Sequence, residues 1–159
     1  MGMYTQVGNL LESNCDYICH QVNCQGKMGS GIAKQIREKW PVVYVDYLEK
    51  CNKEIPDFLF TEIQIVPIEE NKNVINMFSQ FNYGYDNKRY TSYDAFWVCL
   101  GRIKDIVPKG SKIGFPANIG CGLGGANWEV ISTMIEEVLS EDYEVYIYFL
   151  EGDNKNGKK

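Results

Sequence analysis

The chain has 159 residues, of which 45% are hydrophobic and 23% charged, and its net charge is −5. This composition is that of an ordinary globular protein, and the length fits one domain. Sequence-independent binding of nucleic acid needs a basic surface, so we expect no direct nucleic-acid partner for this acidic chain. The composition does not exclude a small anionic ligand held by backbone N–H groups, because such a site needs no net positive charge.

Signals for membranes, secretion and metals are missing from the sequence. No apolar run is long enough for a transmembrane helix, and residues 1–6 lack the regions of a signal peptide. We therefore expect a cytoplasmic protein with no membrane partner. The six cysteines form no C-x-x-C pair and there is one histidine. We predict no metal site and no cofactor, and we expect free thiols.

The first half of the chain predicts one strand and two helices. Residues 16–22 (DYICHQV) are rich in β-branched and aromatic residues and precede a turn signal, which indicates a strand. Residues 31–39 predict a helix that ends before Pro41, because the residue before a proline disfavours helix. Residues 42–51 resume helical spacing. The side chains expected on the apolar face of this second helix are Val42, Val45, Tyr47 and Leu48.

Two strands and a capped helix are expected next. Residues 62–66 and 73–78 predict strands. Residues 92–106 predict a helix, with Thr91 as the N-cap and Asp94 three residues later in a capping-box pattern.

The last elements are again strand, helix and strand. Residues 112–116 predict a strand, and residues 128–139 predict a helix with Asn127 as its N-cap. The apolar stripe expected on that helix is Trp128, Ile131, Ile135 and Val138. Residues 144–150 (EVYIYFL) are almost continuously apolar, which predicts a central strand buried on both faces.

Strands alternating with helices indicate an α/β protein. We predict a three-layer α/β/α sandwich with a mixed, mainly parallel central sheet, formed by one domain over residues 1–150. Residues 151–159 are polar and contain glycine, so we expect a disordered tail. In such sheets ligands bind beyond the carboxyl ends of the strands, where loops enter helices.

Two glycine-rich loops lie at strand-to-helix transitions. Loop one covers residues 23–33 (NCQGKMGSGIA), and loop two covers residues 116–128 (PANIGCGLGGANW). Glycines allow close approach to a ligand, and a helix N-terminus favours a phosphate. A flexible turn is the alternative for either loop alone. Together they suggest one elongated ligand with a diphosphate between them.

Two other nucleotide-binding folds fit less well. Gly120, Gly122 and Gly125 match the G-x-G-x-x-G dinucleotide fingerprint, but a Rossmann domain carries this fingerprint after its first strand. Here one helix and one strand remain, so a dehydrogenase is disfavoured. The chain has no G-x-x-x-x-G-K-[ST], which excludes an ordinary P-loop NTPase.

Three motifs resemble those of the macrodomain family, in order and in spacing. They are Asn23 followed by residues 29–33 (GSGIA), residues 119–125 (IGCGLGG), and residues 7–10 (VGNL) near the N-terminus. The resemblance extends to about Leu150. Within the family, the chain looks like the branch of ADP-ribose-1''-phosphate phosphatases and terminal ADP-ribose glycohydrolases.

The resemblance implies an ADP-ribose site with a definite orientation. Adenosine would lie near Asn9, Leu10 and Tyr148, the diphosphate on loop two, and the distal ribose on loop one. The ligand-binding residues expected in this way are Asn9, Leu10, Gln21, Gly29, Ser30, Gly31, Ile32, Asn118, Gly120, Cys121, Gly122, Leu123, Gly124, Gly125 and Tyr148.

The chain departs from the family pattern at three positions. Asn9 replaces the aspartate that accepts a hydrogen bond from the adenine amine, so we expect weakened adenine recognition. The glycohydrolase branch has a lysine near the position of Gln80 and an aspartate at that of Gly124. A Schiff-base mechanism is therefore not carried over.

Three residues are candidates for catalysis. His20 is the only histidine and would be a general acid, and Asp86 a base for water. Asn23 would hold a distal-ribose hydroxyl or a water. The alternatives are a core histidine, a solvated loop acid and a turn asparagine. A nucleophilic Cys121 is a weaker possibility, because many macrodomains have small, non-nucleophilic residues there.

The leading hypothesis is an ADP-ribose-binding hydrolase that acts at the distal ribose, with ADP-ribose-1''-phosphate as the first substrate to test. Two alternatives stay open. One is a hydrolase that removes ADP-ribose from protein or nucleic acid or cleaves a cyclic ADP-ribose signal. The other is a non-catalytic binder of ADP-ribose. The partner expected is a small-molecule ligand, ADP-ribose or one of its derivatives.

Overall fold

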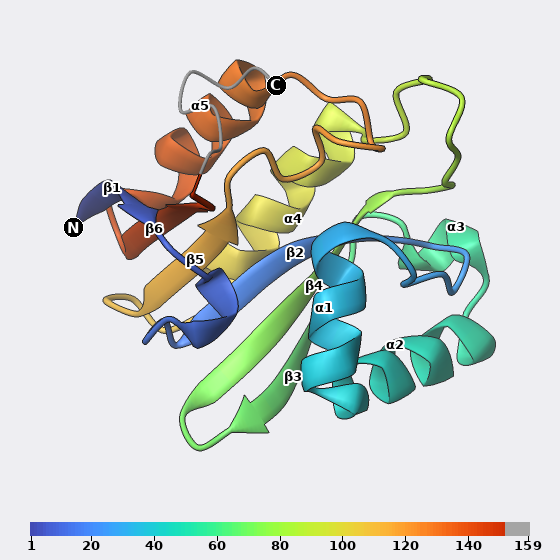
Figure 1. Ribbon diagram of the computed structural model, residues 1–159, viewed down its shortest axis with the longest axis horizontal. Coiled ribbons are helices and arrows are strands. Elements are labelled where there is room, and N and C mark those ends of the chain that lie inside the picture. The colour runs from blue at the N-terminus through green and yellow to red at the C-terminus, as the bar shows by residue number, and fades with distance from the viewer. Residues whose placement is uncertain (152–159) are drawn as a thin grey trace.

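The computed structural model describes residues 1–151 as a three-layer α/β/α sandwich around one mixed sheet (Figure 1). The six strands have the order β1-β6-β5-β2-β4-β3. All neighbours are parallel except β3 and β4, so the predicted mixed, mainly parallel sheet is confirmed. The strands are β1 Gly2–Val7, β2 Tyr17–Asn23, β3 Ile63–Glu69, β4 Lys72–Gln80, β5 Lys112–Pro116 and β6 Glu144–Phe149.

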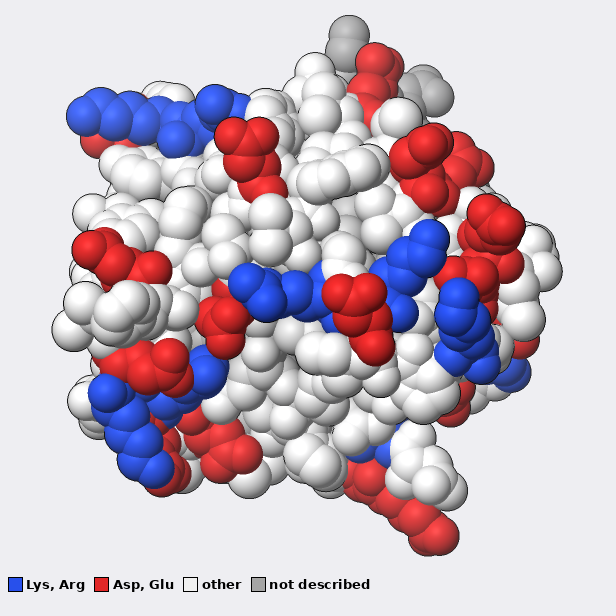
Figure 2. All heavy atoms as spheres, turned by 180° about the vertical axis from the view of Figure 1, so that it is seen from behind, with Lys and Arg blue, Asp and Glu red and all other residues white. Residues whose placement is uncertain are grey.

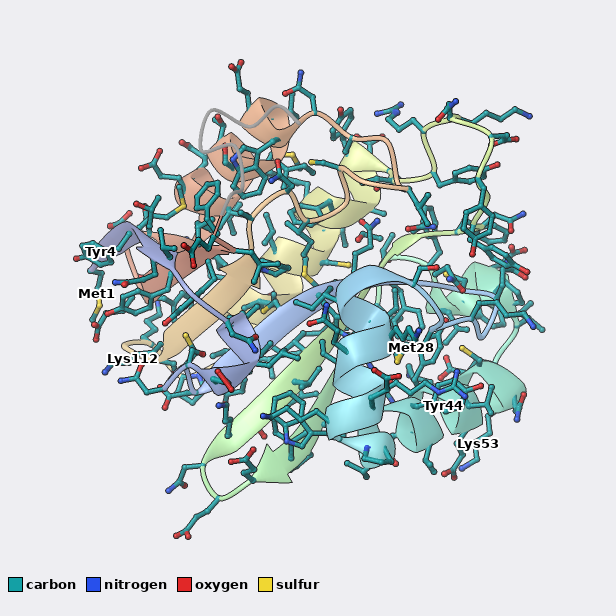
Figure 3. All side chains as sticks on the ribbon, in the orientation of Figure 1. Met1, Tyr4, Met28, Tyr44, Lys53 and Lys112 are labelled. Carbon is teal, nitrogen blue, oxygen red and sulfur yellow. The ribbon has the colours of Figure 1, made fainter. Side chains whose placement is uncertain are left out.

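Helices cover both faces of the sheet. They are the 3-10 helix η1 Leu10–Glu12, α1 Gly31–Lys39, α2 Pro41–Lys53, α3 Pro56–Leu59, α4 Tyr93–Ile106 and α5 Trp128–Leu139. One core lies between the sheet and α4 and α5, and the other lies on the α1 and α2 side. Figure 3 shows Met28 and Tyr44 on the side of α1 that faces α2. The expected tail lies outside the described residues except for Glu151.

Three elements were not predicted from the sequence, namely β1, the 3-10 helix η1 and α3. Strand β1 pairs only with β6, at the edge of the sheet, and four of its six residues are exposed. An exposed edge strand needs no apolar alternation, so its sequence carries little signal. Helix α3 is a single turn that starts at a proline.

Three details of the prediction are wrong. Ser92, not Thr91, is the N-cap of α4, because its Oγ accepts a hydrogen bond from Ala95 N at 3.1 Å. Helix α2 buries Val43 and Tyr47, while Val42 and Val45 are exposed.

The third error concerns β6, whose faces differ. Val145, Ile147 and Phe149 are buried in the core under α4 and α5. Tyr146 and Tyr148 on the other face are half-buried, because α1 and α2 pack over β2 and β3 instead. The N-cap of α5 is confirmed, since Asn127 Oδ1 accepts from Glu129 N at 2.8 Å.

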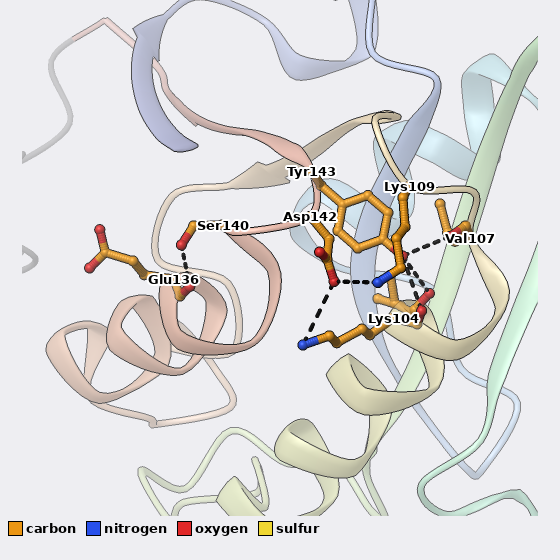
Figure 4. Close-up of polar contacts among 8 residues, drawn as sticks. Lys104, Val107, Lys109, Glu136, Ser140, Asp142 and Tyr143 are labelled. Atoms are coloured by element: carbon orange, nitrogen blue, oxygen red, sulfur yellow. Dashed lines mark hydrogen bonds and ion pairs between the residues drawn. The ribbon is translucent and has the colours of Figure 1, made fainter. Parts of the chain in front are cut away.

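The amino ends of β5 and β6 are tied together (Figure 4). The hydroxyl of the buried Tyr143 donates to Val107 O at 2.6 Å. Asp142 forms ion pairs with Lys109 at 3.0 Å and with Lys104 at 3.7 Å. These contacts hold the amino ends of the strands together, while both glycine-rich loops lie at the carboxyl ends of the strands. Within residues 1–151 no helix is long and apolar enough to cross a membrane.

Candidate functional site

A cavity of about 870 Å³ lies along the carboxyl ends of the parallel strands. Its volume is within the range of about 300–1,000 Å³ that is typical of small-molecule sites. The strand order gives its long axis. At one end Asn9, after β1, and Tyr148, on β6, line the cavity. Loops one and two lie in the middle, and at the other end Gln80, the last residue of β4, and Tyr85 line it. The cavity therefore suits an elongated ligand.

Loop one is shaped by the side chain of Asn23. Its Oδ1 accepts from Gln25 N at 2.9 Å and from Lys27 N at 3.3 Å, and its Nδ2 donates to Lys27 O at 2.8 Å. The buried Tyr47 hydroxyl donates to Asn23 O at 2.7 Å. Asn23 lines the cavity, but its amide holds the turn that follows β2. The loop then leads into α1, which begins at Gly31, a residue with a φ of +57°.

Loop two presents unpaired donors. Within residues 1–151, the backbone N–H groups of Gly122, Leu123 and Gly124 donate to no other protein group. The side-chain Nδ2 of Asn118 is likewise without a partner there, although this residue is only 7% exposed. All four residues line the cavity. Gly122 and Leu123 are exposed, so solvent can accept from their N–H groups, whereas the buried Nδ2 of Asn118 needs a ligand or a water. The loop therefore offers donors to an acceptor oxygen.

Position 124 accepts only glycine. A Cβ there would overlap Thr91 Oγ1 and lie 2.6 Å from the backbone oxygen of Gly120. The loop-two aspartate of the glycohydrolase branch would therefore have no room in this chain.

The charged groups around the cavity are cationic. Among residues 1–151, the lining includes no aspartate, glutamate, histidine or cysteine, while Lys27 and Arg37 contribute positive charge. On the face seen in Figure 2, by contrast, acidic and basic side chains are interspersed. A cavity with donors and cations in a chain of net charge −5 favours an anionic ligand.

His20 does not reach the cavity, which corrects its expected role as general acid. It is fully buried on β2 and pairs through Nε2 with Asn76 Oδ1 on β4. Asn76 Nδ2 donates to Gln64 Oε1 at 3.0 Å, and Gln64 Nε2 donates to the backbone oxygen of Asp46 at 3.0 Å. Because that backbone oxygen can only accept, the chain of bonds makes His20 Nε2 the donor. Burial lowers the pKa of His20 to about 4.

Asp86 is also outside the cavity, so its expected role as base loses its geometric support. Its Oδ1 accepts from Tyr90 Oη at 2.7 Å, and this hydrogen bond lowers the pKa of the exposed carboxyl. Tyr83 and Tyr85 of the same loop do line the cavity. The Tyr85 hydroxyl lies 3.3 Å from Ser30 Oγ, which links this loop to loop one.

The structure brings most of the expected binding residues together. Two of them, Cys121 and Gly125, do not line the cavity. The thiol of Cys121 donates to Ile119 O at 3.4 Å, and Gly125 packs against the backbone of Lys88 and Arg89. Gln80 and Lys27 line the cavity but were absent from the expected set. The position of Gln80 at the carboxyl end of a parallel strand was the signal that could have found it.

No group of three or more potential metal ligands occurs among the described residues. Cys15, Cys19, Cys24, Cys51, Cys99 and Cys121 are all free of disulfides. Burial raises the pKa of Cys19 well above its ordinary value and that of Cys99 to about 12. These thiols are therefore protonated at neutral pH and behave as small apolar side chains.

A scan against models of protein families finds no match. The chain is 24% identical over 144 residues to a DNA ADP-ribosyl glycohydrolase of Thermus aquaticus, an alignment that covers 89% of this chain. The chain spans about two fifths of the length of the relatives it matches.

Solved structures show the same fold. The macrodomain of Thermus aquaticus DarG matches with a TM-score of 0.73 and 23% identity, over 92% of this chain and 97% of that chain. Thermosipho africanus DarTG, solved in complex with ADP-ribose, matches with a TM-score of 0.74 and 21% identity, over 96% of this chain and 43% of that chain.

Proposed function

Since the chain is a macrodomain by fold, we propose that it binds ADP-ribose along the cavity and hydrolyses the bond at C1'' of the distal ribose. The observation that carries the binding proposal is a set of donors without a protein partner in loop two, above all the buried Nδ2 of Asn118, on residues that line a cavity with no described acidic side chain. A diphosphate supplies the acceptor oxygens and the negative charge that such donors lack.

The order of the strands supports one orientation of the ligand. Adenosine lies at the β1 and β6 end, beside Asn9, Leu10 and Tyr148. The diphosphate crosses loop two, and the distal ribose lies between loop one and the end of β4, beside Gln80. In this orientation C1'' points toward the loop with Tyr83 and Tyr85, whose side chains line the cavity and are exposed to solvent.

The proposed substrates carry ADP-ribose on DNA. The similarity to DNA ADP-ribosyl glycohydrolases favours this class over ADP-ribose-1''-phosphate, which is the second substrate to test. Recognition is proposed to rest on the ADP-ribose group itself and not on the DNA strand, since the chain is acidic. As the bond between C1'' and the DNA base breaks, water supplies the hydroxyl that C1'' gains and the proton that the base takes up. The N–H donors of the loops would stabilise the negative charge that develops on the leaving base.

We further propose that the protein is cytoplasmic. Six free cysteines fit a reducing compartment, which supports the cytoplasm. Residues 1–150 are proposed to form one domain.

Turnover assays test the catalytic part of the proposal. Purified protein is incubated with a mono-ADP-ribosylated DNA oligonucleotide, a mono-ADP-ribosylated protein and ADP-ribose-1''-phosphate, and released ADP-ribose is measured. We expect release from the DNA substrate that an excess of free ADP-ribose inhibits. Binding of ADP-ribose without turnover of any of the three would instead favour a non-catalytic binder.

A further inference from the structure

Two glutamines lie side by side where β2 and β4 end in the cavity. The Nε2 of Gln21 donates both to Gln80 Oε1 and to Thr91 Oγ1, each at 2.8 Å. The hydroxyl of Ser79 donates to Gln21 Oε1 at 2.7 Å. Every polar atom of the Gln21 side chain is therefore engaged within the protein, and the contacts join two strands to the loop that precedes α4.

One backbone oxygen fixes the direction of this whole network. The hydroxyl of Thr91 donates to Gly120 O at 2.8 Å, and a backbone oxygen can only accept. The single hydroxyl hydrogen of Thr91 is thus used, so Thr91 must accept from Gln21. The same Nε2 of Gln21 also donates to Gln80, so the side-chain atom of Gln80 that accepts from it is Oε1. The Nε2 of Gln80 is then the atom left for the cavity.

The place of Gln80 decides which part of the ligand it meets. Its Cα is in register with Asn23, the residue from which loop one starts, and its side chain lines the cavity at the β4 end. This is the end that the proposed orientation gives to the distal ribose. A neutral amide at this point can donate a hydrogen bond, but it neither titrates at neutral pH nor forms a covalent imine.

We propose that Gln80 determines specificity by donating a hydrogen bond from Nε2 to an oxygen on C1'' or C2'' of the distal ribose. Gln21 and Thr91 are positioning residues that hold this donor toward the ligand. The inference rests on the proposed function, in which the ligand is ADP-ribose. It makes the β4 end of the cavity a site for a hydrogen-bond acceptor and gives Gln80 no nucleophilic role.

Calorimetry with two ligands tests the proposal. ADP-ribose carries the distal ribose, and ADP carries the same adenosine and diphosphate without it. Gln80→Met keeps the size of the side chain and removes its hydrogen bonds. We expect this variant to bind ADP-ribose about three- to tenfold more weakly, as the loss of one neutral hydrogen bond implies. Its affinity for ADP should stay that of the wild type.

Two further variants separate positioning from folding. Gln80→Glu keeps the acceptor for Gln21 and removes the donor, so it should lose ADP-ribose affinity at least as much. Gln21→Glu leaves Gln80 intact but presents it with carboxylate oxygens, which can only accept. The Nε2 of Gln80 then turns toward residue 21 and away from the cavity. It should lower the ratio of ADP-ribose affinity to ADP affinity. Thermal unfolding of each variant confirms that it is folded.

The outcomes are distinct. Wild-type binding of ADP-ribose with an unchanged ratio in Gln80→Met and Gln80→Glu overturns the role of Gln80. An equal loss for both ligands in the uncharged variant Gln80→Met also overturns it, because it indicates a structural effect. Failure of the wild type to bind either ligand overturns the proposed function itself.

Discussion

His20 on β2 donates its Nε2 hydrogen to the side-chain oxygen of Asn76 on β4, and both residues are fully buried. The proton that a general acid would release is therefore used inside the core. The other ring nitrogen, Nδ1, has no partner among the described residues. This pair makes the only histidine of the chain a structural residue.

The first prediction concerns the dependence of stability on pH. Burial lowers the pKa of His20 from 6.5 to about 4 in the folded protein. Between these values the unfolded chain binds a proton that the folded protein does not, so the free energy of unfolding falls as pH falls from 6.5 to 4. The loss reaches about 3 kcal/mol at 1.4 kcal/mol per pKa unit.

Urea unfolding at several pH values measures this loss for the wild type and for His20→Gln, which can still donate to Asn76. We expect the variant to lose much of the dependence on pH and to bind ADP-ribose within about twofold of the wild type. The same fall in stability in both proteins would contradict the assignment. A large loss of turnover at unchanged stability would restore His20 as a catalytic candidate.

The second prediction concerns adenine recognition. Asn9 Oδ1 accepts from Leu11 N at 3.0 Å as the N-cap of η1, so its amide nitrogen is left for a ligand. The adenine amine is a donor and needs an acceptor. Asn9→Asp keeps a good N-cap and supplies a second acceptor oxygen. We expect calorimetry to show ADP-ribose binding about three- to tenfold tighter, as for a charge-assisted bond. Unchanged or weaker binding would place adenine elsewhere.

The third prediction concerns the fit of loop two. Gly124→Ala places a Cβ within 3 Å of Thr91 Oγ1 and Gly120 O, so the loop must shift. We expect a loss of about 1–3 kcal/mol in the free energy of unfolding, as for overpacking. Gly122→Ala is the matched control, because nothing lies within 4 Å of its added Cβ. Equal stability of the two variants in urea unfolding would show that loop two yields at position 124.

The fold was predictable because its signals are local. The N-cap of α5 at Asn127 and the end of α1 before Pro41 depend on backbone chemistry next to the residue, and both glycine-rich loops follow strands. The errors at the two strands have a common cause. The exposure of β1 and of one face of β6 depends on which helix lies over them, and this packing is not written in either segment.

The candidate site was predictable at its loops and less so at its side chains. The spacing of the glycines in the sequence was enough to locate both loops. Whether His20 faces the cavity or the core depends on the phase of β2 in the sheet, which a shift of one residue would reverse. Gln80 matters through its bond to Gln21, 59 residues away in sequence, which no local pattern reveals.

Calorimetric titration of the wild-type protein with ADP-ribose tests the central claim most directly. The account predicts one-to-one binding that is much tighter than for adenosine, because the diphosphate accepts from loop two. Absence of measurable heat at millimolar ADP-ribose, with the protein shown to be folded, would contradict it.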